Sequence, residues 1–67
     1  MKNVAKLKKY IVLSDFTQGQ LAKELGTTVQ SLNLKLNGKR ELKANELEQL
    51  ITLLGIPPAE AGELLFS

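Results

Sequence analysis

The chain has 67 residues, 43% of them hydrophobic, so it can build one small core but not two, and we expect one domain over residues 1–67. It contains neither cysteine nor histidine, which excludes disulfides and thiolate metal sites and removes the commonest general base, so we expect no metal, cofactor, small-molecule substrate or enzyme activity. No apolar run approaches the roughly 20 residues of a membrane-spanning helix, and the lysine-rich start lacks the apolar stretch of a secretory signal, so we expect a cytoplasmic protein without membrane contact.

The charges are distributed unevenly along the chain. Residues 1–43 carry all nine Lys and Arg against three carboxylates, a net charge of +6, whereas residues 44–67 carry four glutamates and no cation, a net charge of −4. A basic half of this kind suggests a surface for a polyanion, with the acidic half facing away or contacting another partner. The alternative is a domain whose uneven charge has no such role.

Apolar periodicity predicts helices along nearly the whole chain, beginning with residues of about 3–13. Val4, Leu7 and Ile11 recur at helical spacing on one face of this first helix. The opposite face carries three lysines, Lys2, Lys6 and Lys9. We interpret this stripe as a solvated face rather than a membrane-lying surface, because the helix contains no Trp or Phe.

A second helix is predicted to begin after Thr17. The Thr17 hydroxyl can accept a hydrogen bond from the backbone N–H of Gln20 while the Gln20 side chain reaches back, which is the capping-box arrangement. Phe16 and Leu21 fit the accompanying hydrophobic staple. Gly26 can close the helix after about two turns.

The third predicted helix runs from about residue 29 to 36. Thr27 and Thr28 both suit its N-cap, and Gly38 supplies a natural stop. Small Ala22 would let this helix approach the second one. Two short helices joined by a tight, glycine-containing turn are the physical requirement of a helix-turn-helix.

Two further helices complete the predicted fold. A fourth has leucine or isoleucine at i, i+3, i+4 and i+7 and closes at Gly55, with Glu46 at its N3 position and Lys43 as a poor cap residue. Pro58 can open a fifth. We therefore expect an all-α, compact bundle of about five short helices in which the second and third form the helix-turn-helix.

The segment TQGQLAKELGTTVQSLNLKLNGKR, residues 17–40, resembles the phage repressor and Cro-type family of helix-turn-helix proteins, which have the lambda repressor-like fold. The resemblance rests on TQ, LA, LG, a Thr cap, an apolar residue at Leu32 and NGK at fixed offsets, and it extends more loosely through LITLLGIPP. It implies a Cro-like transcriptional regulator of phage or prophage origin. Such proteins bind operator double-stranded DNA without a cofactor, usually as homodimers.

The resemblance also implies residues that hold the phosphate backbone. Gln18 matches a glutamine that donates to a phosphate and braces the recognition helix, and Thr28 matches a cap residue close to the backbone. Asn37, Lys39 and Arg40 match a helix-end loop whose amides and cations hold the phosphate track. Such contacts position the protein without reading sequence. For Gln18 and Thr28 the alternative is simple capping.

Base reading is expected from the exposed face of the third helix. At about 100° per residue, Leu34 lies almost opposite the buried direction, with Gln30 and Asn33 beside it. The Gln30 carboxamide can donate and accept, as adenine N6 and N7 require, and Asn33 has the same chemistry with a shorter reach. Val29 points partly inward but can touch a thymine methyl.

Leu34 admits three interpretations. It can pack on thymine methyls, it can form a protein contact together with Val29, or a rotated or frayed helix can shelter it. Lys35 stands where many relatives have a core apolar residue, and Leu36 takes over that role. This shift can rotate the helix and make Lys35 a phosphate contact.

Two other functions use the same fold. One is a modulator that binds another phage repressor and alters its DNA occupancy, and the other is the antitoxin of a toxin-antitoxin pair. We expect dimerisation to use the helical domain itself. The candidate surface for a homodimer or partner repressor is Leu64, Leu65 and Phe66, which can alternatively cap the core.

Overall fold

A computed structural model describes residues 4–66 of the chain, and within that range it contains five α-helices and no strand. The predicted all-α bundle is therefore confirmed. The predicted first residue of the first helix, and Lys2, lie outside the described residues. The helices are α1 (Val4–Leu13), α2 (Gln18–Leu25), α3 (Val29–Leu36), α4 (Ala44–Leu54) and α5 (Pro58–Phe66).

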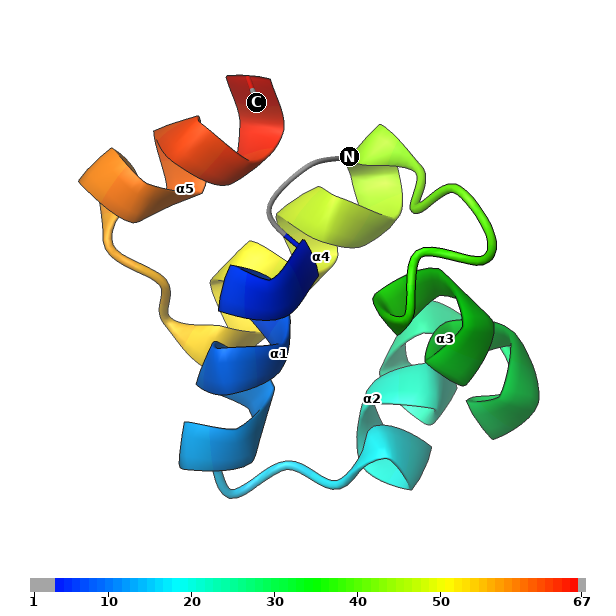
Figure 1. Ribbon diagram of the computed structural model, residues 1–67. Helices are drawn as coiled ribbons and strands as arrows, with labels where there is room; N and C mark the ends of the chain where they lie inside the picture. Colours follow the sequence, from blue (N-terminus) through cyan, green and yellow to red (C-terminus); the bar gives the residue numbers. More distant parts are fainter. Residues whose placement is uncertain (1–3, 67) are drawn as a thin grey trace.

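The helices surround one apolar core. α2 and α3 lie together on one side of the molecule, α5 lies on the other, and α1 and α4 lie between them (Figure 1). α3 packs against both α1 and α2, and α4 packs against α2 and α5. All five helices contribute to the cluster of buried side chains, which consists of Leu7, Ile11, Leu21, Ala22, Leu32, Leu36, Leu42, Leu47, Leu50, Ile56, Ala61 and Leu64.

The start of α2 is fixed by the predicted capping box. The Thr17 Oγ1 atom accepts from the Gln20 N–H at 3.1 Å, and the Thr17 N–H donates to Gln20 Oε1 at 2.9 Å. At α3 the structure selects Thr28 rather than Thr27, because Thr28 Oγ1 accepts from the Ser31 N–H at 3.1 Å. These bonds satisfy N–H groups that a helix start leaves without partners.

The turn between α2 and α3 depends on a glycine. Gly26 has φ 71°, in the left-handed region, and its N–H donates to the Lys23 carbonyl at 3.2 Å. The next N–H, of Thr27, reaches back to the Ala22 carbonyl at 2.9 Å. This is the hydrogen-bond pattern of a Schellman motif, and it turns the chain directly into α3.

Ion pairs join α1 to α5. The Lys6 ammonium donates to the Glu63 carboxylate and lies 3.5 Å from that of Glu60. The hydrogen bond to Glu63 is the main reason that the pKa of Lys6 is raised above its ordinary value, with burial opposing and Glu60 adding. Within the predicted solvated stripe, Lys9 is exposed, whereas Lys6 keeps 33% of its side-chain surface exposed and also pairs with α5.

The apolar side chains at the end of α5 lie partly in the core and partly on the surface. Leu64 is buried, with 1% of its surface exposed, whereas Leu65 is 37% and Phe66 is 88% exposed. Leu64 thus caps the core, which was one of the two predicted alternatives, and only the last two side chains remain on the surface.

Replacing Gly26 with alanine should lower the free energy of unfolding by about 1–2 kcal/mol, the cost of a left-handed backbone for a residue with a Cβ. Nothing lies within 4 Å of a Cβ at this position, so the cost is conformational and not steric. Gly62→Ala is the matched control, because Gly62 also has open space but lies inside α5. It should raise stability by about 0.5–1 kcal/mol. Urea unfolding followed by circular dichroism measures both changes, and equal effects would contradict the argument.

Candidate nucleic-acid interface

α3 presents a polar face opposite its buried one. Leu32 and Leu36 are 0% and 2% exposed, whereas Gln30 and Asn33 are exposed and Val29 is 49% exposed. The Gln30 carboxamide forms no hydrogen bond with any residue in the range 4–66. Its donor and acceptor therefore both remain available to a ligand.

Leu34 is half-buried instead of fully exposed. Its carbonyl accepts from the N–H of Lys39 at 2.9 Å and of Arg40 at 3.3 Å, so the chain after α3 folds back against this turn. Part of the Leu34 surface is thus covered, but without the rotated or frayed helix of the third interpretation, because α3 is helical throughout Val29–Leu36 with Leu32 and Leu36 buried.

A row of hydrogen-bonded polar side chains, which we call the amide row, runs from α1 across α3 to α2. Lys8 Nζ donates to Asn37 Oδ1 at 3.0 Å, Asn37 Nδ2 donates to Asn33 Oδ1 at 3.0 Å, and Asn33 Nδ2 lies 3.4 Å from Gln18 Oε1. Three of these residues were predicted site residues, and the structure brings them together. Lys8 was missed, because it lies 29 positions from Asn37 in the chain.

The loop after α3 offers side chains rather than backbone donors. The N–H groups of Gly38, Lys39 and Arg40 all donate to carbonyls of α3. The side chains of Lys39 and Arg40 are exposed and form no ion pair within the described part of the chain. At the other end of α3, the Thr28 hydroxyl accepts its capping bond and keeps its own hydrogen to donate.

Lys35 is placed differently from the prediction. Its ammonium donates to Glu46 Oε2 at 2.6 Å, and the two side chains are only 12% and 11% exposed. Glu46 Oε1 also accepts from the Lys43 N–H at 3.0 Å, whereas the Lys43 side chain, a donor only, forms no cap. Because Lys35 faces α4 in this ion pair, it is not among the exposed cations that can meet a phosphate.

The pKa of Glu46 reflects this environment. Burial by itself raises the pKa of the carboxyl, but the hydrogen bonds from Lys35 and from the Lys43 backbone, together with both positive charges, outweigh burial and hold the pKa below its ordinary value of 4.5. Glu46 is therefore ionised at neutral pH and keeps Lys35 in place.

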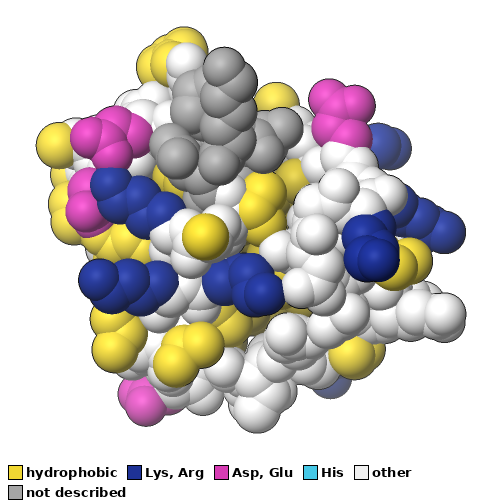
Figure 2. All heavy atoms as spheres, viewed as in Figure 1, with side chains coloured by type: hydrophobic (Ala, Val, Ile, Leu, Met, Phe, Trp, Pro, Cys, Tyr) yellow, Lys and Arg dark blue, Asp and Glu magenta, His cyan; other side chains and the backbone are white. Residues whose placement is uncertain are grey.

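Pairing between the two halves of the chain offsets part of the positive charge of α1 and α3. Lys6 and Lys35, from the basic half, are paired with carboxylates of the acidic half. Figure 2 shows lysine and arginine side chains in a band that runs over α1 and on toward α3.

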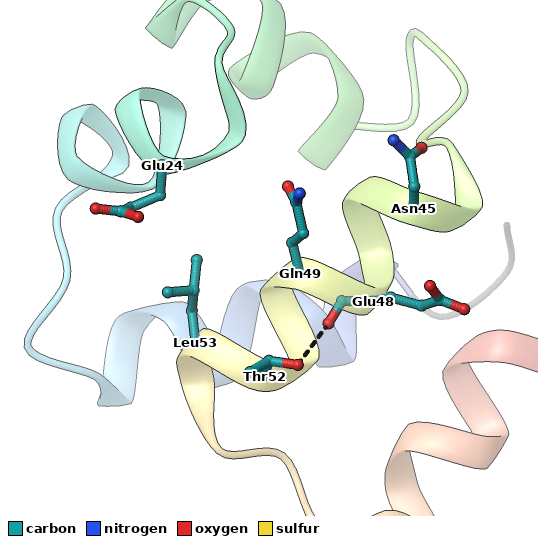
Figure 3. Close-up of a pocket in the computed structure, with 6 residues that line it drawn as sticks. All are labelled: Glu24, Asn45, Glu48, Gln49, Thr52 and Leu53. Atoms are coloured by element: carbon teal, nitrogen blue, oxygen red, sulfur yellow. Dashed lines mark hydrogen bonds between the residues drawn. The ribbon is translucent and has the colours of Figure 1, made fainter.

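A hollow of about 420 Å³ lies between α2 and α4, away from the predicted site residues. Gln49 and Leu53 extend from α4 toward α2, whereas the Thr52 hydroxyl bonds back to the Glu48 carbonyl at 3.1 Å (Figure 3). Residues 4–66 contain no group of three acidic, His or Cys side chains that could hold a metal. Over the same range no helix has the length and hydrophobicity to span a membrane.

Comparison with known proteins decides the family. A family model described as helix-turn-helix matches residues 7–60, a range that contains α2, the Gly26 turn and α3. The chain belongs to this helix-turn-helix family. The family is that of the Cro- and C1-type repressors, a regulatory family that is not typically enzymatic, so the chain is a DNA-binding helix-turn-helix regulator. No curated protein and no solved structure matches the chain.

Lys35→Met should raise the pKa of Glu46, because it removes a hydrogen bond and a positive charge that lower this pKa, while burial still raises it. An NMR titration of the Glu46 carboxyl carbon measures the pKa. Lys39→Met, which removes an exposed cation with no carboxylate partner in residues 4–66, is the control and should leave that pKa nearly unchanged.

The same linkage gives a pH dependence of stability. The depressed pKa means that ionised Glu46 stabilises the fold fully above pH 4.5, and that this contribution is lost as the pH falls through the lower folded value. Glu46→Gln should therefore lose less stability than the wild type between about pH 5 and about pH 3. Parallel urea titrations at each pH test this, and identical pH profiles would contradict it.

Proposed function

We propose that this helix-turn-helix regulator is a small, Cro-like transcriptional regulator of phage or prophage origin, a single domain that acts in the bacterial cytoplasm. In this proposal α3 enters the major groove of operator DNA. The observation that carries it is the exposed, unpartnered Gln30 on a helix whose opposite face is buried through Leu32 and Leu36. A carboxamide that forms no other hydrogen bond suits base recognition, because its donor and acceptor can both bond to a base edge. The fixed direction of the helix face matters as well, since the two hydrogen bonds form in only one orientation of the carboxamide.

We assign base reading chiefly to Gln30 and Val29. Gln30 matches the N6 donor and N7 acceptor of adenine, and the exposed methyl groups of Val29 match a thymine methyl. Asn33 contributes less, because its amide already takes part in the amide row. The half-buried Leu34 offers the groove only part of its surface.

Phosphate contacts surround this reading face. We assign them to the Gln18 amide, the Thr28 hydroxyl, the Asn37 amide and the cations Lys39 and Arg40. All except the half-buried Gln18 are exposed. Lys35 is left out, because it would first have to break its ion pair with Glu46.

Titrating the protein against DNA from around its own gene at several salt concentrations tests the proposal. Affinity should fall with salt with a log-log slope of about −0.9 per phosphate contacted, and Lys39→Ala should reduce that slope by about one such unit. Gln30→Ala should keep the slope but lose about 1–3 kcal/mol of discrimination at one base pair. A flat salt response, or an unchanged base preference in Gln30→Ala, would count against DNA reading by α3.

We further propose that the protein binds DNA as a homodimer through Leu65 and Phe66, whose exposed apolar surface would then be buried. Phe66→Ser should weaken dimerisation by at least about tenfold, the scale of one buried aromatic side chain. Val12→Ser is the matched control, because Val12 is 81% exposed on a different helix. Light scattering across a concentration series measures the dimer. A monomer at all concentrations, or equal effects of both variants, would exclude this surface.

A second candidate function is a modulator that binds another repressor and alters its DNA occupancy. It is supported by Val29, an aliphatic side chain 49% exposed on the face proposed to read DNA. Gel-shift assays with and without the neighbouring regulator separate the two functions. Autonomous binding supports the Cro-like function, whereas a shift that appears only with the second protein supports the modulator.

A further inference from the structure

The direction of the hydrogen bonds in the amide row is set at Asn37, by the Lys8 ammonium on one side and the Asn33 backbone carbonyl on the other. An asparagine or glutamine amide can face a neighbour with its oxygen or its NH₂ group, but a lysine ammonium can only donate. Lys8 therefore requires the Oδ1 atom of Asn37, at 3.0 Å, to face it. The reversed amide would place two donors against each other.

The orientation of the Asn37 amide determines the orientations of the next amides in the amide row. With Oδ1 turned to Lys8, the NH₂ group of Asn37 points to Asn33, where it meets two acceptors, the backbone carbonyl at 2.9 Å and Oδ1 at 3.0 Å. Asn33 then has its NH₂ group left for Gln18 Oε1, at 3.4 Å. The Gln18 oxygen is thereby occupied, and its NH₂ group is the end of the row.

We propose that Lys8 is a positioning residue for DNA binding, which fixes the amide row so that the Gln18 NH₂ group is presented to a DNA phosphate. This inference rests on the proposed function, in which Gln18 is a phosphate contact. An NH₂ group suits that role because phosphate oxygens only accept, and a reversed Gln18 would turn an acceptor toward them. Lys8 thus acts on the phosphate through three side chains and not by touching it.

The amide row also affects which side chains of α3 can recognise DNA bases. Asn33 uses its oxygen for Asn37 and one amide hydrogen for Gln18, so a bidentate contact with adenine would compete with both bonds. Gln30 has no such commitment in residues 4–66. The row therefore leaves Gln30 as the residue that discriminates among bases and gives Asn33 a supporting part.

NMR of the free protein tests the row without DNA. Lys8→Met keeps the aliphatic stem and removes the donor, so the side-chain amide resonances of Asn37, Asn33 and Gln18 should all shift. Lys9→Met changes the same charge on the next residue of α1, which is exposed, and should leave them unchanged. Lys8→Arg retains a donor-only cation and should preserve the wild-type pattern. Unchanged resonances in Lys8→Met would overturn the positioning role.

DNA affinity then separates positioning from direct contact. Lys8→Met should weaken binding about five- to tenfold, the scale of one ordinary hydrogen bond, while the salt slope stays the same. In an Asn33→Ala background, where the row is already cut, the same substitution should have little further effect. A salt slope reduced by about 0.9, or a full effect in the Asn33→Ala background, would mean that Lys8 binds phosphate directly and would overturn the inference.

The experiments distinguish a failure of the proposed function from a failure of the positioning role of Lys8. A folded wild type that binds no DNA in any gel shift overturns the proposed function and, with it, the phosphate contact. The NMR comparison of Lys8→Met with Lys9→Met still decides in that case whether Lys8 orients the amides.

Discussion

The burial of Leu32 and Leu36 is the constraint on which the interface depends. The two side chains lie one turn apart on α3, and both are almost wholly removed from solvent by the common core. Truncating such a leucine typically costs about 2–5 kcal/mol, a large part of the roughly 5–15 kcal/mol that stabilises a domain. Rotation of α3 about its axis is therefore strongly opposed, and the side chains on its outer face keep their direction.

Ala22 makes this burial possible because it allows α2 and α3 to pack closely. It is 2% exposed on α2, and its carbonyl also receives the N–H that closes the turn into α3. A small side chain at the contact lets two helices approach, while the left-handed Gly26 sends the chain back at once. The angle between the two helices is thus set by packing and by local backbone geometry together, which explains how a domain of this size can present a defined surface.

Signals confined to a few neighbouring residues made most of the fold predictable. The Thr17 capping box and the closing Gly26 depend on residues within five positions of each other, so the sequence contains the whole interaction. The ion pair of Lys35 with Glu46 spans 11 positions, and the bond from Lys8 to Asn37 spans 29. Helical periodicity cannot reveal such contacts, because they depend on how helices pack against each other.

For the same reason the sequence predicted most of the residues of the candidate site, but not which of them contact each other. The outward direction of Gln30 follows from helix geometry alone, whereas the half-buried position of Leu34 does not. Charge counted along the sequence also overstated what a polyanion meets, because Lys6 and Lys35 are paired with carboxylates of the acidic half.

The ion pair between Lys35 and Glu46 has a structural consequence for the loop that follows α3. A lysine side chain that is only 12% exposed would normally be costly to bury, but Glu46 offsets the cost by pairing with Lys35 while it also caps the first turn of α4. The last turn of α3 and the first turn of α4 are thereby joined, and the loop between them is held at both ends. Lys39 and Arg40 lie on that loop, so their backbone has less freedom to lose when the side chains meet a phosphate.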